Sequence, residues 1–406
     1  MPSKPKNKLL SELLNLKGVK VKGYQNYQDI GIILVLSATQ KQAICHRCQN
    51  KSNKLHQNHW YTIKDLPILD QPVYLTINRR QFKCQHCRIP FSEELDYVNK
   101  KRRYTKRLAQ DIVQQVLADD IKTVAQKKAV SEEEIQTMLR DVGEELIKSK
   151  PNGLKKLGID EIALIKGQGN YCAVLVDLEA SKLVGILEGR TQDELRKTLQ
   201  QWGKEVLIQI EEVSIDLWKP YKNLVEELMP NAQVVADRFH VMKQVNEELD
   251  RQRKKERNAA EKLKESAEKE KLLSGLKKSK YVLLKNEKNL NNKGQEKLKQ
   301  VKEVSPVLSQ MHKGKEELRK IFDGEENWGM GLLKLGDWLL SFYKYFPNSK
   351  KTIIRWIGEI ISYFDQRTTQ GVVEGINNKI KLIKRSGYGF RNFDNFKLRC
   401  LLCWRY

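Results

Sequence analysis

The sequence predicts a multidomain chain that combines α+β and α/β parts, and three observations support this prediction. Two Cys-x-x-Cys pairs are separated by sequence that alternates in hydrophobicity like β-strands. The segment from Lys156 to His240 then mixes short strands with helices. From Gln244 to Lys320 the chain is dominated by Lys, Glu, Leu and Asn, which predicts long charged helices. The 406 residues suffice for roughly three domains with cores of their own.

The composition indicates a polyanion as partner. Lys and Arg number 75 against 51 Asp and Glu, a formal net charge of +24, and the mean hydropathy is −0.61. Such a charge attracts nucleic acid or an anionic surface. The longest apolar run, around Ile30–Val35, is far short of the about 20 residues that a membrane-spanning helix needs. The basic first 18 residues lack the features of a signal peptide, so we expect an intracellular protein with no membrane partner.

A hairpin and a metal site are expected in the first 100 residues. Alternation from Val19 to Ser37 predicts a two-stranded hairpin in an N-terminal segment 1–37. Residues 38–100 have the layout of a zinc ribbon, because two Cys-x-x-Cys turns each offer two thiolates to a tetrahedral Zn²⁺. Four thiolates leave no open position, so the predicted zinc is structural; the alternative is four unrelated buried thiols. The predicted ligands are Cys45, Cys48, Cys84 and Cys87.

Residues 101–150 predict three short helices with helix-turn-helix spacing. Apolar residues such as Leu108 and Ile112 mark the first helix, and a turn at Val130-Ser131 precedes the third. In such a motif the third helix enters the major groove of DNA. A small helical bundle that holds domains together is the alternative, since Glu132–Glu134 at the start of the third helix would repel phosphates. The candidate DNA-binding residues here are Arg102, Arg103, Lys106, Arg107 and Arg140.

Acidic residues lie within or at the ends of the predicted strands of the segment 151–243. Asp160 lies on the first strand, Asp216 and Asp237 end later strands, and Glu374 lies on a helix far downstream. A lone strand-end carboxylate is usually a turn or cap residue, but several in one sheet suggest a divalent-metal site. A ribonuclease-H-like core has this arrangement: one aspartate in the first strand, one at the end of the fourth, and a third acid on a late helix. Oxygen ligands select two Mg²⁺ or Mn²⁺ ions, which act on phosphodiesters.

The second metal ligand is either Asp216 or Asp237. Counting strands from Asp160 makes the strand that ends at Asp216 the fourth, which lies next to the first. Asp216 is therefore the predicted ligand with Asp160 and Glu374, and Asp237 is the alternative or an acid that supports a ligand.

Two segments complete the predicted domain organisation. Residues 244–360 form an α-helical insertion whose aromatic side chains at helical spacing are expected in its core rather than stacked on bases. Residues 361–406 contain the last catalytic helix and a basic end. Its candidate DNA-binding residues, for which a solvated basic surface is the alternative, are Lys379, Lys381, Lys384 and Arg385.

Several blocks of the sequence resemble a known family. Residues 157–161, 236–241, 374–379 and 386–392 are similar to the hallmark blocks of bacterial insertion-sequence transposases of the ISL3 group. Upstream, residues 79–84, 90–93 and 103–107 resemble the zinc-ribbon and helix-turn-helix blocks of the same group in the same order. The resemblance covers nearly the whole chain.

The resemblance implies a DDE transposase. Its zinc ribbon and helix-turn-helix would bind the terminal inverted repeats, and its ribonuclease-H-like core, interrupted by the helical insertion, would cut DNA and join the ends to target DNA with Mg²⁺. It also implies a homodimer or higher homo-oligomer on the DNA and a location in the prokaryotic nucleoid. Two alternatives stay open: an inert or domesticated DNA-binding protein derived from a transposase, and a nuclease that cuts without joining.

Overall fold

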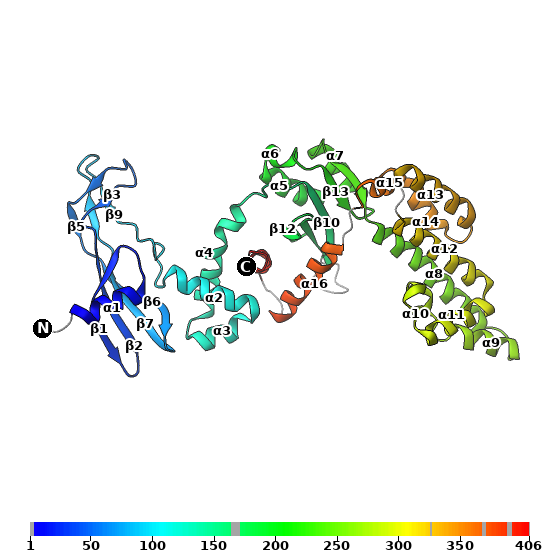
Figure 1. The fold of residues 1–406 in the computed structure, drawn as a ribbon, viewed down its shortest axis with the longest axis horizontal. Coiled ribbons are helices and arrows are strands. Elements are labelled where there is room, and N and C mark those ends of the chain that lie inside the picture. Colours follow the sequence, from blue (N-terminus) through cyan, green and yellow to red (C-terminus); the bar gives the residue numbers. More distant parts are fainter. Residues whose placement is uncertain (1–3, 164–170, 325–326, 368–370, 388–391, 406) are drawn as a thin grey trace. The chain divides into compact units, whose positions relative to one another are not determined.

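The computed structural model describes residues 4–163, 171–324, 327–367, 371–387 and 392–405. The chain divides into two compact units (Figure 1). The first unit contains Met1–Lys148 and Ile383–Cys403, and the second contains Ser149–Leu382 and Trp404–Tyr406.

The first unit begins with helix α1 (Lys4–Leu14) and a four-stranded sheet in the order β1-β2-β7-β6. Its strands are β1 (Val19–Tyr27), β2 (Gly31–Ala38), β6 (Trp60–Ile68) and β7 (Gln71–Asn78). The predicted hairpin is β1–β2, but it does not form a segment of its own, because β7 pairs with β2 in parallel. An isolated hairpin buries too little apolar surface to be stable. Here both hairpins bury their alternating apolar residues, among them Leu34, Leu36, Val73 and Leu75, in one core.

The cysteine pairs lie in turns that directly follow the short strands β3 (Ala43–Ile44) and β8 (Gln81–Lys83). Strand β3 pairs with β4 (Lys51–Ser52). Strands β5 (Leu55–Gln57), β8 and β9 (Pro90–Ser92) form a second small sheet in the order β5-β8-β9. The stacked rings of Phe82 and Phe91, with centroids 6.1 Å apart, provide the small apolar core beside the cysteines.

Four helices complete the first unit: α2 (Lys106–Ala118), α3 (Ile121–Lys128), α4 (Glu132–Lys148) and α17 (Phe393–Leu402). Thr105 and Asp120 cap α2 and α3 through side-chain oxygens that accept backbone N–H groups of the first turn. The three predicted helices are therefore present. The fourth, α17, comes from the end of the chain, and its Leu398 and Leu402 lie in the same core as Leu108 and Ile112.

The second unit contains a five-stranded sheet in the order β12-β11-β10-β13-β14. Its strands are β10 (Lys156–Ala163), β11 (Tyr171–Asp177), β12 (Lys182–Ile186), β13 (Glu212–Ile215) and β14 (Gln233–Ala236). The first three are antiparallel neighbours, whereas β13 pairs with β10 in parallel and β14 with β13 in parallel. The expected adjacency of the first and fourth strands is confirmed. Helices α5 (Gln192–Trp202), α6 (Lys204–Leu207) and α7 (Lys219–Leu228) connect the strands.

A long helical segment follows β14. Helix α8 begins at Arg238, directly after the strand, which is earlier than the predicted boundary at residue 244. Helix α15 ends the segment and packs against β14. The described elements of this segment, α16 after it included, are α8 (Arg238–Glu261), α9 (Ala267–Leu276), α10 (Lys280–Leu284), η1 (Glu287–Asn289), α11 (Asn292–Val304), α12 (Pro306–Asp323), α13 (Trp328–Phe342), α14 (Pro347–Arg355), α15 (Ile357–Gln366) and α16 (Gly371–Ser386).

Most of the aromatic residues of this segment belong to its core. Trp338, Phe342, Phe346 and Trp356 are buried, and the rings of Trp338 and Phe346 stack with centroids 5.6 Å apart. Trp328 is exposed instead. Within the described residues, no helix combines the length and apolar character that crossing a membrane requires.

Candidate active site and metal centre

The four predicted zinc ligands come together in the first unit. Their sulfur atoms all lie within 4.8 Å of one another, and the thiols form no disulfide. The Sγ atoms of Cys45 and Cys87 are 3.7 Å apart, and those of Cys48 and Cys84 are 3.5 Å apart. Zinc–sulfur bonds of about 2.3 Å in a tetrahedron place sulfurs about 3.8 Å apart. The observed spacing therefore fits a Zn²⁺ ion held by four cysteines.

The turn of the second knuckle favours the thiolate of Cys84, whereas the neighbouring thiols and burial raise the pKa of Cys87. The backbone N–H of Cys87 donates to Sγ of Cys84, 3.5 Å away, and this hydrogen bond is the main reason why the pKa of the Cys84 thiol lies below its usual value. Backbone donors stabilise a thiolate, which is the form that binds zinc.

In the second unit, three aspartates lie in a row across neighbouring strands. Ile159 of β10 pairs with Ile215 of β13, and Ile215 pairs with Ala236 of β14. The next residue is Asp160 within β10, Asp216 directly after β13 and Asp237 directly after β14. Because neighbouring strands are about 4.8 Å apart, Asp216 is one strand from Asp160 and Asp237 is two strands away.

Asp160 is anchored from the helix that contains the predicted glutamate. Its Oδ2 accepts a hydrogen bond of 2.7 Å from Nδ2 of Asn377, on α16. Its Oδ1 accepts one of 2.7 Å from the backbone N–H of Glu161. Both contacts fix the carboxylate at the middle of the sheet.

Asp216 has an unsatisfied carboxylate. Within the described part of the chain, its buried Oδ1 has no hydrogen-bond partner. Burial raises the pKa of the Asp216 carboxyl to about 6; protonated His240 lowers it, and Glu161 and Asp160 raise it further. A buried acid without a donor, next to other acids, is a site where a cation replaces the missing partner.

Glu374 lies in the first turn of α16, on a helix that approaches β10 closely. A Cβ atom added at Gly158 of β10 would lie 3.1 Å from Cγ2 of Val373, so the glycine leaves room for α16. Glu374 and Asp160 line one cavity of about 500 Å³, together with Asp237, Asn377 and Lys381.

Asp237 is engaged locally. Its Oδ1 accepts the backbone N–H of Phe239 at 3.1 Å and caps α8, and its Oδ2 lies 3.2 Å from Nδ1 of His240. Burial lowers the pKa of His240, but the hydrogen bond and charge of Asp237 outweigh it, so the pKa is raised. Asp216 lines a neighbouring cavity of about 780 Å³, which His240 and Glu161 share with the first. The two cavities therefore meet at His240 and Glu161.

The acids are farther apart than the cysteines. Among the described residues, the four cysteines are the one set of three or more Cys, His, Asp or Glu whose ligand atoms all lie within 4.8 Å of one another. The donor set of Asp160, Asp216 and Glu374 nevertheless fits a hard divalent cation, because all three donors are carboxylates and one is orphaned.

Two site residues were not predicted from the sequence. Asn377 lies one turn after Glu374, so the helical period places both on the same face, and this spacing was a usable signal. Glu161 is held by Arg190, with Oε2 and Nη1 2.7 Å apart, and Arg190 lies over the ring of Tyr171. Nothing in the local sequence indicates these distant partners.

The predicted DNA-binding residues of the first unit fall into two groups. Arg102 forms two hydrogen bonds to Asp141, of 2.6 and 2.7 Å, and Arg107 forms an ion pair with Asp65. These two arginines therefore connect elements of the unit. Arg103, Lys106 and Arg140 are exposed.

The four basic candidates near the end of the chain have different surroundings. Lys381 lines the cavity that contains Glu374, and Nζ of Lys379 lies 4.7 Å from the ring centroid of Trp404. Lys384 and Arg385 belong to the first unit. Of the sequence block 386–392, residues 388–391 lie outside the described residues.

Comparisons with known proteins match the zinc ribbon, the helix-turn-helix and the transposase family. A family model described as "Transposase", of the ISL3 group, matches residues 157–400. A "zinc-finger of transposase IS204/IS1001/IS1096/IS1165" matches residues 41–87, and a "Helix-turn-helix domain of transposase family ISL3" matches residues 93–143. The chain is 26% identical over 405 residues to the transposase for insertion sequence element IS1001 of Bordetella parapertussis, covering 97% of each chain. It is 29% identical over 260 residues to the transposase for element IS1557 of Mycobacterium tuberculosis, covering 59% of this chain and 57% of the relative.

Proposed function

The chain belongs to the ISL3 family of transposases, and from this premise we propose that it cuts DNA at the ends of an insertion sequence and joins those ends to target DNA. The observation that carries the proposal is the row of Asp160 and Asp216 on paired strands, with Glu374 on a helix hydrogen-bonded to Asp160 through Asn377. Strand order β12-β11-β10-β13-β14 supports a ribonuclease-H-like core for this chemistry.

Asp160, Asp216 and Glu374 would hold two Mg²⁺ or Mn²⁺ ions. Such ions supply an activated water or 3′-hydroxyl and stabilise the leaving oxygen of a phosphodiester. Asn377 keeps the Asp160 carboxylate oriented, and Lys381 adds a positive charge to the cavity where a scissile phosphate would lie. Asp237 positions His240, which lines both cavities, and it lies one strand farther from Asp160 than Asp216 does, so it is the alternative ligand rather than the assigned one.

The first unit would read the terminal inverted repeats. Helix α4, which carries the exposed Arg140, is the candidate recognition helix. Exposed Arg103, just before α2, and exposed Lys106, the first residue of α2, are candidate phosphate contacts. Zn²⁺ on the four cysteines would keep the ribbon folded. We also expect a homodimer or higher oligomer on DNA, since two element ends must be joined.

The test is cleavage of element-end DNA by the full chain in Mg²⁺, with mapping of the cut strands and of joined products. Wild type should cut and join, and Asp160→Asn should bind the DNA but lose essentially all cleavage. The matched control is Asp337→Asn, an exposed aspartate of α13, which should cleave normally. Specific binding without cutting would favour the inert DNA-binding protein instead, and cutting without joining would favour a nuclease.

A further inference from the structure

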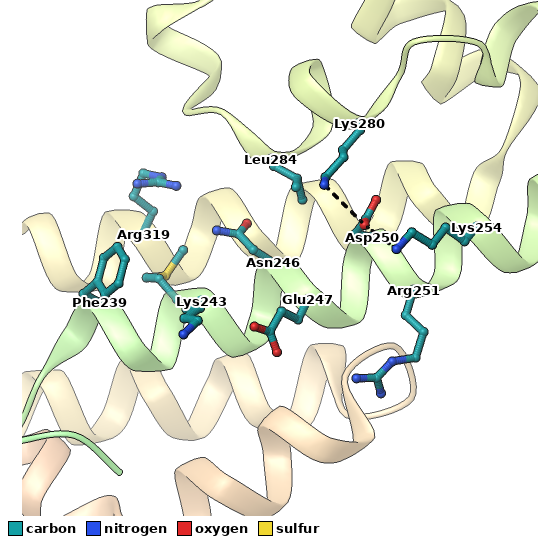
Figure 2. A pocket seen from close by; sticks show the side chains of 11 residues that line it. Phe239, Lys243, Asn246, Glu247, Asp250, Arg251, Lys254, Lys280, Leu284 and Arg319 are labelled. Carbon is teal, nitrogen blue, oxygen red and sulfur yellow. Dashed lines mark ion pairs between the residues drawn. The ribbon is translucent and has the colours of Figure 1, made fainter. Parts of the chain in front are cut away.

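A cavity of about 550 Å³ lies along helices α8, α10 and α12 (Figure 2). We call it the α8 groove; its lining residues in Figure 2 include Phe239, Asn246, Asp250, Lys280 and Arg319. Phe239, Met242, Lys243 and Arg319 line both this groove and the cavity that contains Asp160 and Glu374. The groove therefore continues from the candidate active site onto the helical segment.

An aromatic ring stands where the two cavities join. Phe239 is 56% exposed, and its backbone is held at the start of α8 by the hydrogen bond to Asp237. Its ring meets His240 edge-on, with centroids 5.6 Å apart. Single exposed apolar residues are common on proteins, but this ring is fixed beside the acids and presents a face on which a base can stack.

The charge of the α8 groove suits phosphates. Five basic side chains line it, against two acidic ones; the basic ones are Lys243, Arg251, Lys254, Lys280 and Arg319. Of the acids, Asp250 is already paired with Arg253 at 2.7 Å and with Lys254 at 3.2 Å. Figure 2 shows Phe239 and Arg319 toward one end of the groove and Lys280 with Asp250 farther along α8.

Two buried polar atoms of the groove lack hydrogen bonds within the described residues. They are Oδ1 of Asn246 and Nε of Arg319, the latter with only a long ion-pair contact of 4.0 Å to Oε2 of Glu316. Leaving such atoms unpaired is unfavourable, so they indicate a ligand that offers both kinds of group. A nucleotide does so, because its phosphate accepts from a guanidinium and its base amines donate to an amide oxygen.

We propose that the α8 groove binds unpaired nucleotides of the DNA strand that leaves the active site, with Phe239 stacked on a base and Arg319 on a phosphate. The proposal rests on the DNA-cleaving function proposed above. The volume is that of pockets for small ligands, about 300–1,000 Å³, which admits one or two nucleotides and not a duplex. The α8 groove is therefore a site for single-stranded DNA.

The test compares two forms of the same element-end DNA, one blunt and one with three unpaired nucleotides at the cleavage position, by binding to the full chain in magnesium-free buffer. Wild type should bind the unpaired form more tightly. Phe239→Leu should reduce that preference by about 5- to 100-fold, since stacking on an aromatic ring is lost, and Arg319→Gln should also reduce it. Phe239→Trp should keep the preference. The matched controls Trp328→Leu, an equally exposed aromatic on α13, and Lys313→Gln on α12 should keep it as well.

The outcomes separate the two proposals. The single-strand site is wrong if the Phe239→Leu protein keeps the full preference for unpaired DNA, or if wild type shows no such preference. This conclusion holds whether or not the protein cleaves DNA. Cleavage by wild type in Mg²⁺ is measured separately on the blunt DNA. If that cleavage fails while the preference still depends on Phe239, the proposed catalysis is wrong and the DNA-binding site stands.

Discussion

The Asp216 carboxyl is buried beside two other acids and has a pKa raised to about 6, so its charge opposes folding when no cation is bound. Its unfolded value is 3.8. Below pH 3.8 both states are protonated, and between there and about 6 the folded state binds a proton that the unfolded state does not. Stability of the magnesium-free protein therefore falls as the pH rises through this window, and stays lowest above it.

This asymmetry predicts that Asp216→Asn stabilises the magnesium-free protein at pH 7.5 while it abolishes cleavage. A gain of about 1–3 kcal/mol corresponds to a pKa shift of this size. Thermal unfolding after dialysis into magnesium-free buffer, without a chelator that strips zinc, measures it. The gain should vanish near pH 4, and Asp337→Asn should show none at either pH; a destabilised Asp216→Asn would contradict the buried-charge argument.

Asp237 should behave differently from Asp216, because it orients His240 and caps α8. We expect Asp237→Asn to lower cleavage by about 10- to 100-fold, as loss of a supporting partner does, and to leave residual activity in Mg²⁺. Single-turnover cleavage of the element-end DNA distinguishes the reduced activity expected of Asp237→Asn from the lost activity expected of Asp216→Asn. A dead Asp237→Asn protein next to a nearly normal Asp216→Asn protein would reverse the ligand assignment.

The cysteine cluster predicts that zinc and folding of the ribbon are coupled. Cys84→Ser removes one of four thiolates, so the protein should hold less than one zinc per chain and lose stability in the first unit. Elemental analysis and thermal unfolding measure both effects. Cys172→Ser, at a buried cysteine of β11 outside the cluster, should keep its zinc.

At the scale of single elements, the position of α16 depends on a glycine. A side chain at Gly158 would meet Cδ2 of Leu178 at 2.9 Å and Cγ2 of Val373 at 3.1 Å, so Gly158→Val should push α16, with Glu374 and Asn377, away from β10. Cleavage should fall by at least about 10-fold, because misplacement by 1 Å is costly in catalysis. Binding to element-end DNA should stay within a few-fold of wild type, since Gly158 and the start of α16 lie outside the first unit. Gly375→Ala, on the same helix with open space around it, is the matched control.

The elements also show what the sequence can and cannot predict. Local patterns sufficed for the cysteine knuckles, for the turn at Val130-Ser131, and for the strands that end at Ile215 and Ala236, because each depends on residues close in the chain. Parallel pairing of β2 with β7 joins hairpins on either side of a cysteine knuckle, and no local signal specifies it. The partners of Arg102 and Arg107, Asp141 and Asp65, are likewise set by tertiary packing, which is why both arginines were predicted as DNA ligands.

At the scale of the whole molecule, the two ends of the chain build one unit. Residues 361–406 were predicted as one segment, because basic residues recur from Lys379 to the end of the sequence. The structure assigns Ile383–Cys403 to the first unit instead. The local sequence of α17 does not indicate that Leu398 and Leu402 lie in the core of α2 and α4.

The closing prediction concerns α17 and DNA recognition. Leu398 fills the space above Gly143 of α4, where an added Cβ would lie 2.0 Å from its Cδ1, and Arg399 donates to the backbone carbonyl of Asp119 at the end of α2. Both contacts connect α17 to the candidate helix-turn-helix, so Leu398→Ala should destabilise the first unit by about 2–5 kcal/mol. Affinity for element-end DNA should then fall more than affinity for random duplex, because charge alone supports nonspecific binding whereas base reading needs ordered helices. Leu382→Ala, at an exposed leucine of α16, is the matched control and should change neither quantity. Competition binding at several salt concentrations measures the ratio of the two affinities, and an unchanged ratio in a measurably destabilised Leu398→Ala protein would mean that α4 does not read the DNA sequence.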